Sequence, residues 1–458
     1  ASAEMKTFIK EYTYQASDED SKNSSRIISL REVKRLLLEE LGTYLESETE
    51  VKNFQLSKDQ ITTLTAGIVQ TELVEEKWDG RTYWIKAKIK ADSNDVVKAI
   101  DKLRKDRQKT KELEEVRKKS DALLKENARL RRELAKPAKK TRAKGQEKRA
   151  KAYKKTIKEL DVVDWFEKGY AAFTLGNYAE ALAAFNKAIE LDPNDAASYI
   201  NRAGVYNGLG NHNQAIKDYD KFIELIPQYA PAYIQRGRSY VMLGNYNQAI
   251  KDLDLAIVLI QAIKDSNKTI ELVSDEHMAY MNRGFAYVFL DNCNQAIKDF
   301  NKSIELVPQD SKVYYARGRC YIMLRNYNQA IKDFDKYIEG DQNTQDAYFL
   351  RGTAYFALDN YNQAIKDLDM AIALDQHDAR YYYLRGAAYA DLRNFNLAIR
   401  NFDMTIELEP NHSDAYYSRG IAYGKSGRYE QAKADVKIAA RMGNKRAQDK
   451  LRQMNVDW

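Results

Sequence analysis

Residues Asn360–Asp367 have the sequence Asn-Tyr-Asn-Gln-Ala-Ile-Lys-Asp, and close copies of this phrase recur along the chain. The other copies are Asn211–Asp218, Asn245–Asp252, Asn292–Asp299, Asn326–Asp333 and the more diverged Asn394–Asn401. Successive copies start 34 residues apart, except for one interval of 47 residues. A fixed period of this length is typical of a repeat array, in which each unit packs on its neighbours.

Alignment on this phrase divides much of the chain into eight units. They are 162–195, 196–229, 230–263, 277–310, 311–344, 345–378, 379–412 and 413–446. Residues 264–276 break the period, and we interpret them as an insertion that forms either a surface loop or a partner contact. Residues 447–458 complete the array as a mostly polar capping helix, as expected at the end of a repeat stack.

The first unit connects this period to a known family. It contains Trp165, Gly169, Leu175, Gly176, Tyr178, Ala181, Phe185, Ala188 and Pro193. This pattern resembles the tetratricopeptide repeat over residues 162–446, which implies one helix–turn–helix per unit. The fold class that we predict is mainly α: an α-solenoid of about eight such repeats, preceded by a small α+β domain and a coiled-coil helix.

An arginine recurs in the first helix of each later unit, where the family usually has a leucine. An aspartate follows sixteen residues later, on the second helix. The pairs are Arg202 and Asp218, Arg236 and Asp252, Arg283 and Asp299, Arg317 and Asp333, Arg351 and Asp367. Because a charge on a packed helix face needs a partner, we predict Arg–Asp pairs within or between units. The alternative is an arginine ladder that binds an anionic ligand.

Resemblance to the family places a ligand on the inner wall, formed by the first helix of each unit. The wall positions carry apolar and aromatic residues: Ile234, Met281, Phe289, Tyr315, Met323, Phe349, Phe356, Tyr383 and Tyr417. Such a wall suits a hydrophobic helix or an extended peptide of a protein partner. The alternative is that some of these residues are core between layers, since apolar periodicity often means packing.

Residues 1–92 have the pattern of a small α+β domain. A β-branched and aromatic run at Thr7–Tyr14 predicts a strand, and apolar spacing over 25–46 predicts an amphipathic helix. Ser57 and Gln60 have capping-box spacing, which predicts a short helix. Two strand-like runs, Ile68–Lys77 and Arg81–Ala91, are joined through Asp79-Gly80 as a hairpin. This order resembles small α/β domains of bacterial envelope and flagellar-accessory proteins.

Residues 93–136 predict a long helix with a heptad seam. The seam positions are Leu113, Val116, Ser120, Leu123, Asn127, Leu130 and Leu134. Spacing of three and four residues is that of a two-stranded coiled coil, and an asparagine in the seam favours an in-register pair. We therefore predict that Leu113, Val116, Leu123, Asn127, Leu130 and Leu134 join two copies of the chain. The alternative is a single charged helix that lies on the array.

The net charge of +7 comes from one region. Residues 136–158 contain eleven Lys or Arg and one acidic residue, Glu147. We interpret 137–161 as a basic linker that becomes helical towards the array. Such a block is most often solvated, although it can also contact a membrane surface or another polyanion. Binding of single-stranded nucleic acid is not expected, because aromatic residues are not interleaved before Tyr153.

No catalytic set is evident in the sequence. The four histidines, His212, His277, His377 and His412, fall at turns or unit boundaries. The two cysteines, Cys293 and Cys320, define neither a disulfide framework nor a zinc site, and whether they pair is left open. Phosphate loops, metal-ligand clusters and nucleophile elbows are also absent. We therefore expect neither enzyme activity nor a cofactor.

These features together predict a non-enzymatic protein-interaction scaffold, oligomerised through its first domain and coiled coil. One alternative is a subunit of a self-assembling ring or filament, and another is an adaptor tethered to lipid, nucleic acid or wall polymer. The chain starts with Ala-Ser-Ala, which resembles the remnant of signal cleavage but also of a trimmed tag. We expect a periplasmic or extracellular bacterial protein, with the cytoplasm as the alternative.

Overall fold

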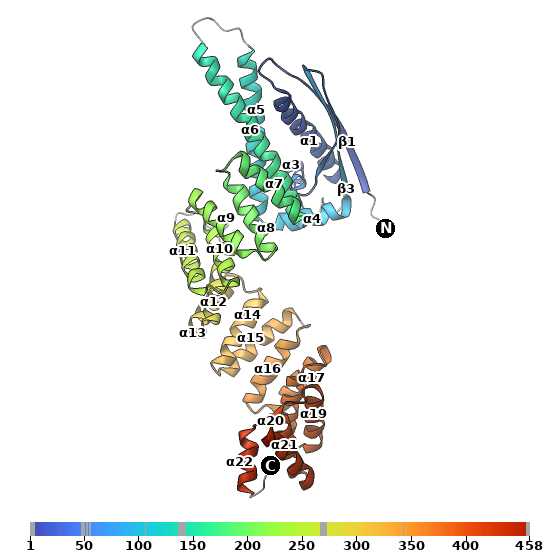
Figure 1. Cartoon of the computed structure of the whole chain (residues 1–458), viewed down its shortest axis with the longest axis vertical. Coiled ribbons are helices and arrows are strands. Elements are labelled where there is room, and N and C mark those ends of the chain that lie inside the picture. Colours follow the sequence, from blue (N-terminus) through green and yellow to red (C-terminus); the bar gives the residue numbers. More distant parts are fainter. Residues whose placement is uncertain are drawn as a thin grey trace. The chain divides into compact units, whose positions relative to one another are not determined.

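The computed structural model describes residues 5–46, 51, 54, 56–105, 107–135, 143–265, 273–341 and 343–454. The chain divides into two compact units, Ala1–Leu243 and Gly244–Trp458, and each is described by itself. Helices dominate both units, and three strands lie near the N-terminus, which confirms the predicted fold class (Figure 1).

The first unit begins with a three-stranded antiparallel sheet. Its strands are β1 (Met5–Gln15), β2 (Thr71–Trp78) and β3 (Thr82–Asp92), in the order β1-β3-β2. Helix α1 (Lys22–Glu46) packs against β1 and β3, and α3 (Lys58–Ala66) packs against α1. Val33, Leu37, Leu41 and Leu45 of α1 are fully buried, so the core of this domain lies between α1 and the sheet.

Local sequence determines these elements as expected. Tyr83, Ile85, Ala87 and Ile89 of β3 are buried, while the residues between them are more accessible, because alternate strand residues face opposite sides. The hairpin turns at Gly80, whose φ is +98°. The capping box of α3 is also confirmed, since the Ser57 and Gln60 side chains each accept the other's backbone N–H.

The region after the sheet differs from the prediction. Helices α4 (Ser93–Lys105) and α5 (Arg107–Leu134) occupy the range of the predicted long helix, and residue 106 between them lies outside the described residues. Helix α6 (Ala143–Thr174) packs against α5 and continues into the first repeat, so the described part of the expected linker is helical from Ala143 onwards. The preceding part of that linker, 137–142, lies outside the described residues. The helix forms because Tyr153, Thr156, Ile157 and Leu160 make one buried face.

The heptad seam of α5 packs within its own chain, whereas the sequence predicted that it joins two copies of the chain. Leu113, Asn127 and Leu130 are buried within the chain, and Val116, Leu123 and Leu134 are partly buried against the same core. The Asn127 side chain donates to Thr156 Oγ1 on α6 at 3.3 Å. The apolar face of α6 therefore satisfies the seam that was expected to join two copies. Self-association of the chain stays a prediction, but these residues are not on an open surface.

A buried carboxylate fixes the start of α1 to the α5–α6 hairpin. The Asp20 side chain accepts hydrogen bonds from the Tyr153 hydroxyl, the Tyr14 hydroxyl at 3.2 Å and the Ser17 backbone at 2.7 Å. Arg131 of α5 lies 3.6 Å from the same carboxylate. Burial and the adjacent Asp20 carboxylate raise the pKa of both tyrosines. These bonds hold the turn after β1 against two helices that are more than 100 residues away in sequence.

The repeats have the predicted helix–turn–helix form. In the first unit, α6 is followed by α7 (Tyr178–Leu191), α8 (Ala196–Gly208), α9 (His212–Leu225) and α10 (Ala230–Met242). The second unit contains α11 (Tyr246–Asp265), α12 (Val273–Phe289), α13 (Cys293–Leu306), α14 (Ser311–Met323), α15 (Tyr327–Gly340), α16 (Gln345–Ala357), α17 (Tyr361–Leu374), α18 (Ala379–Asp391), α19 (Phe395–Leu408), α20 (Ser413–Lys425) and α21 (Tyr429–Arg441).

The repeated phrase marks the turn within each repeat. The residue before the first asparagine of the phrase, or before Arg428 in the last repeat, has a positive φ in all eight repeats. Four are glycines with φ between +73° and +82°, and the others are Asp291, Arg325, Asp359 and Arg393 at +56° to +58°. The next backbone N–H returns to a carbonyl near the end of the first helix, as Asn360 does to Tyr355 at 2.9 Å. This bond closes the helix end and reverses the chain.

A small residue in each first helix allows the second helix to approach closely. A Cβ on Gly284 would lie 2.6 Å from the Phe300 ring, and a Cβ on Gly386 would lie 2.9 Å from the Phe402 ring. Phe300 and Phe402 are themselves buried. The glycine and the phenylalanine therefore form one packing contact, repeated along the array.

The insertion and the chain ends are only partly described. Helix α11 extends to Asp265 and α12 begins at Val273, so both helices use part of the predicted insertion 264–276. Residues 266–272 lie outside the described residues, as do the Ala-Ser-Ala start and residues 455–458. The C-terminal helix α22 (Lys445–Gln453) packs on α21 through Ala447 and Leu451, as expected of a capping helix.

Candidate functional site

The recurring arginines form a ladder of ion pairs and hydrogen bonds. The Arg351 guanidinium donates to both carboxylate oxygens of Asp367 at 2.8 and 2.6 Å, and also to Asp335 of the preceding repeat at 2.6 Å. Its side chain is 17% exposed and that of Asp367 is 7% exposed. Each such arginine therefore joins the two helices of its own repeat and connects them to the repeat before.

The same pattern recurs with small substitutions. Arg202 bonds Asp218 and Asn186, Arg283 bonds Asp299 and Asp254, Arg317 bonds Asp333 and Asn301, Arg385 bonds Asn401 and Asp369, and Arg419 bonds Asp435 and Asp403. Arg236 pairs with Asp220 in the first unit, and Asp252 is buried in the second. Both predicted modes, within and between repeats, are thus present.

Burial dominates the electrostatics of the ladder carboxylates. It raises the pKa of Asp333 and Asp367, even though the adjacent arginines act in the opposite direction. In turn, the aspartates outweigh desolvation and raise the pKa of Arg317 and Arg351. The guanidinium N–H groups of these arginines donate to carboxylate or amide oxygens of the repeats. The arginines are therefore structural and offer no open site for an anionic ligand.

A second periodic feature lies on the first helices of the second unit. Helices α12, α14, α16, α18 and α20 contact one another in succession and so form one face. At the equivalent position of four consecutive repeats this face carries an aromatic residue, each half-buried: Tyr315, Phe349, Tyr383 and Tyr417. We call these four residues the ring ladder.

Neighbouring side chains hold the rings of this ladder in place. The Tyr315 ring packs on Phe334 and Tyr337, and the Tyr383 ring packs on Phe402 and His412. The Phe349 ring lies 5.1 Å from Tyr381, and the Arg380 guanidinium lies 5.2 Å above it. The Tyr315 and Tyr383 rings thus pack on second helices, whereas the Phe349 ring packs on the next first helix, α18, and all three rings remain half-buried.

The remaining wall residues divide into three groups. Ile234 is 0% exposed, so its assignment to a ligand groove is wrong. Met281 and Phe356 are half-buried. Phe289 and Met323, at 58% and 54% exposed, are the most accessible. Phe289 stacks on Tyr246 at 4.9 Å, and the Met323 sulfur lies 3.5 Å from that of Cys293.

Comparison with sequence models of known families now identifies the array. Models described as tetratricopeptide repeat match residues 163–195 and 346–378, then 184–217, 300–332 and 401–434, and also 230–260, 279–310 and 379–412. The matches fall in all eight repeats that the period defines. The chain belongs to the tetratricopeptide repeat family. It is a protein–protein interaction scaffold, the general role of such repeats.

Solved structures that resemble this tetratricopeptide repeat protein cover only part of it. A crystal structure of MamA is 28% identical, with a TM-score of 0.34, and covers 36% of this chain and 96% of MamA. YrrB, described as having an unusual peptide-binding site, is 26% identical, with a TM-score of 0.36 and coverage of 44% and 97%. PilF of Pseudomonas aeruginosa is 18% identical, with a TM-score of 0.42 and coverage of 49% and 96%. None of the curated proteins compared with the chain matches it.

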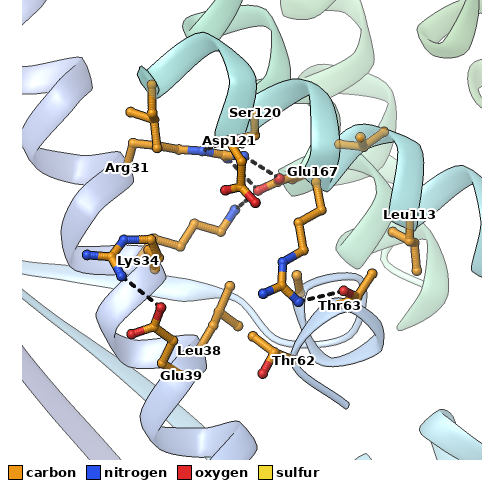
Figure 2. Close-up of a pocket in the computed structure, with 15 residues that line it drawn as sticks. Arg31, Lys34, Leu38, Glu39, Thr62, Thr63, Leu113, Ser120, Asp121 and Glu167 are labelled. Carbon is orange, nitrogen blue, oxygen red and sulfur yellow. Dashed lines mark hydrogen bonds and ion pairs between the residues drawn. The ribbon is translucent and has the colours of Figure 1, made fainter. Parts of the chain in front are cut away.

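A cavity of about 170 Å³ lies in the first unit, between α1, α3, α5 and α6 (Figure 2). Its walls include Arg31, Lys34, Arg117, Asp121 and Glu167. The cations are already engaged: Arg31 and Lys34 pair with Glu167, and Arg117 donates to Thr63 and to the Asp59 carbonyl. The cavity is also below the roughly 300–1,000 Å³ of small-molecule sites. It is therefore a gap beside a structural joint.

That joint is a buried ionic cluster in the first unit of the tetratricopeptide repeat protein. Arg31 of α1 donates to Glu167 and Asp164 of α6 and to Ser120 of α5, each at 2.7 Å. Burial disfavours the charge of Glu167, but Arg31 and Lys34 outweigh it and lower its pKa to about 2. Burial raises the pKa of Asp164 despite the same arginine. The cluster joins the α+β domain to the first repeat, and sequence reasoning missed it.

Other candidate groups serve packing. Cys293 and Cys320 are both free thiols and both buried, and burial together with the neighbouring Cys293 raises the pKa of Cys320. His277 bonds Ser303 and Asp310, whereas His412 caps α20. Within the described ranges, no group of three or more His, Cys, Asp or Glu residues is arranged to hold a metal ion. Among the helices described, none is long and apolar enough to cross a bilayer.

Proposed function

We propose that the second unit binds an extended, partly apolar segment of a protein partner along the ring ladder, and that the chain acts as a non-enzymatic adaptor. The observation that carries this proposal is the recurrence of a half-buried aromatic residue at one position of four consecutive first helices: Tyr315, Phe349, Tyr383 and Tyr417. Aromatic side chains offer large contact areas at low entropic cost, and they are enriched in protein interfaces.

The spacing of the ladder favours one backbone conformation of the ligand. Helices in contact lie about 8–10 Å apart, so successive rings are separated by roughly that distance. A polyproline II segment rises about 3.1 Å per residue and presents every third side chain on the same side, about 9 Å apart. A β-strand presents alternate side chains about 7 Å apart. A segment with apolar residues at every third position therefore fits the ladder better than one with strand alternation.

One charge adds polarity to this face. The Arg319 side chain is exposed, near the Tyr315 ring, and no carboxylate among the described residues lies within ion-pair distance of it. By contrast, Arg380 is paired with Asp378. An acidic residue in the partner, next to its first apolar anchor, would pair with Arg319. This contact would set the direction in which the segment lies along the array.

The experiment is a selection of random 12-residue peptides displayed on phage against the full chain. We expect enriched peptides to carry apolar residues three apart, and to bind Tyr383→Ala or Phe349→Ala at least tenfold more weakly in fluorescence polarisation. Tyr429→Ala is the matched control, because this tyrosine is 73% exposed and lies on a second helix. Circular dichroism checks that the variants are folded. Enriched peptides that bind the ring variants and wild type equally would refute the proposal.

A second candidate function rests on the outer face of α6. Opposite the buried Tyr153 and Ile157, α6 exposes Lys148, Lys151, Lys154, Lys155 and Lys158. Lys151 and Lys155 pair with Glu147 and Glu159, and the other three lysines leave a band of net positive charge. Such a band supports contact with a polyanion, which falls steeply with salt. Changing these lysines to glutamine should abolish salt-sensitive sedimentation with anionic lipid vesicles, if the band has this role. The predicted location outside the cytoplasm is tested separately by fractionating cells that express the full-length gene.

A further inference from the structure

The two edges of the sheet differ in how they are protected. At the β2 edge the register shifts between Leu73 and Glu75, and the strand carries three glutamates. Irregularities and charges of this kind prevent pairing with another strand. The β1 edge has neither proline nor register shift, and it pairs with β3 over eleven consecutive residues, Met5 to Gln15. A long regular edge is a template for strand addition.

The pairing pattern shows which backbone groups of β1 face outwards. Ala16 donates its N–H to the Arg81 carbonyl at 2.7 Å, so the even-numbered residues of β1 bond to β3. The odd-numbered residues Met5, Thr7, Ile9, Glu11 and Thr13 direct their N–H and C=O groups away from the sheet. In the part of the chain that the structure describes, these groups have no hydrogen-bond partner. At Gln15 the edge ends, because the Arg131 guanidinium donates to its carbonyl.

We propose that β1 pairs with β1 of a second copy, antiparallel and centred on Ile9, to form a continuous six-stranded sheet. In this register Ile9 faces Ile9, Thr7 faces Glu11 and Met5 faces Thr13 on the solvent side. On the α1 side, Phe8 faces Lys10 and Lys6 faces Tyr12. Only residues 5–13 take part, and the odd-numbered residues in this range supply the outward backbone N–H and C=O groups that form the new hydrogen bonds. A two-fold contact of this kind joins identical surfaces and closes on itself.

Neighbouring registers are disfavoured by charge. Centring the pair on Lys10 places two lysines opposite each other, and it also requires the Gln15 carbonyl that Arg131 already occupies. Centring it on Glu11 opposes two glutamates, and centring it on Phe8 opposes Lys6 and Lys10. Like charges directly opposite in a sheet are destabilising. Among these registers, the one centred on Ile9 leaves no like charges facing each other.

The lysines of β1 do not prevent this contact. Side chains of even-numbered residues point towards α1, where the Lys6 ammonium lies 3.8 Å from the Tyr44 ring centroid and Lys10 lies 3.3 Å from Glu40. These contacts direct both ammonium groups towards α1 of their own copy. The solvent side of the edge instead exposes Met5 at 61% and Ile9 at 51%. Pairing with a second copy covers both apolar side chains, which otherwise remain in water.

The test measures self-association of the full chain by sedimentation velocity up to about 100 µM, a range that detects micromolar dimers. Ile9→Pro removes one outward N–H from each copy but no bond to β3, because proline is tolerated on an edge whose N–H faces solvent. We expect association to weaken at least tenfold. Thr7→Glu places a second carboxylate opposite Glu11 of the second copy, while in its own copy it faces Lys90 of β3, so it should weaken association without weakening the sheet. Ile9→Lys opposes two lysines across the contact and should also weaken association.

Controls separate this contact from non-specific effects. Val74→Lys adds the same charge at the β2 edge and should leave association unchanged. Ile9→Cys should form a disulfide between copies with oxidised glutathione, because opposed Cα atoms in such a pair lie about 5.5 Å apart. Val74→Cys should not form one. A monomeric wild-type chain, or Thr7→Glu and Ile9→Lys variants that associate as tightly as wild type, would overturn the proposal. Peptide binding by the second unit is unaffected in either case.

Discussion

Replacing Glu167 by glutamine removes the central negative charge of the ionic joint in the first unit. The wild-type carboxylate accepts from both terminal nitrogens of Arg31 and pairs with Lys34, and it is only 8% exposed. After the substitution, Arg31 keeps Asp164 and Ser120, but one buried positive charge loses its compensation. Breaking a buried pair by removing one partner costs about 3–5 kcal/mol.

The pH dependence gives an independent measure of the same interaction. In the unfolded chain Glu167 titrates near the ordinary glutamate pKa of 4.5, and in the folded protein at about 2. Because the folded pKa is lowered, the stabilisation is fully present above pH 4.5 and is lost as the pH falls towards 2. A difference of about 2.5 in pKa corresponds to about 3 kcal/mol. The difference in stability between wild type and Glu167→Gln should therefore shrink over this range.

Urea unfolding followed by tryptophan fluorescence is the assay. The chain has four tryptophans, and Trp78, Trp84 and Trp165 belong to the first unit, so a Trp458→Phe background reports that unit alone. Glu39→Gln is the matched control, since Glu39 pairs with Arg35 at 45% and 44% exposure. Such an exposed pair contributes at most about 1 kcal/mol. The reasoning is refuted if Glu167→Gln unfolds within about 1 kcal/mol of wild type at pH 7.

Three further predictions concern the repeats, each measured by urea unfolding followed by circular dichroism. Arg351→Ala should destabilise the second unit by about 3 kcal/mol because it leaves Asp367 buried without a cation. Asp367→Asn should lower the free energy of unfolding by less, since Asn401 already accepts a hydrogen bond from Arg385 at the equivalent position of the next repeat. Gly284→Ala should cost about 1–3 kcal/mol, because its Cβ would lie 2.6 Å from Phe300, and a simultaneous Phe300→Leu change should recover part of this loss. Arg393→Gly should stabilise by about 0.5–1 kcal/mol, as φ is +58° there and four repeats already carry glycine; an unchanged midpoint would show that the left-handed turn is not strained.

The ring ladder shows how far sequence reasoning extends to the candidate site. Family resemblance located Tyr315, Phe349, Tyr383 and Tyr417 on the first helices, and the structure places all four there, half-buried. It also assigned Ile234 to the same wall, where packing covers it completely. Position in a repeat determines the face on which a residue lies. Accessibility depends on the size and packing of its neighbours, which vary from repeat to repeat.

The ionic joint left a weaker signal in the sequence. Arg31 and Lys34 are four and seven residues after Ile27, so both lie on the apolar face of α1. A charged residue on such a face indicates a buried partner. The partner itself, Glu167, is 136 residues after Arg31, and a single sequence gives no means of connecting them.

The sequence by itself determined the features that depend on local or periodic patterns. The 34-residue period defined the repeats, the phrase Asn-Tyr-Asn-Gln-Ala-Ile-Lys-Asp defined their turns, and the sixteen-residue spacing paired Arg202, Arg283, Arg317 and Arg351 with their aspartates. These inferences hold because both partners lie within one repeat, or in the next, where helix geometry brings them together.

Tertiary structure alone decided which long-range partner satisfied each surface. The heptad seam of α5 specifies that a helix with a matching apolar face must cover it, but not whether that helix belongs to the same chain. Helix α6 supplies this face, although its many lysines suggested a linker. Because α6 buries the seam, the seam is not a surface for a second copy. The β1 edge has free outward hydrogen-bonding groups and becomes the candidate surface for self-association. The physical reason is that pairing preferences are local, whereas the choice among competing partners depends on the whole folded chain.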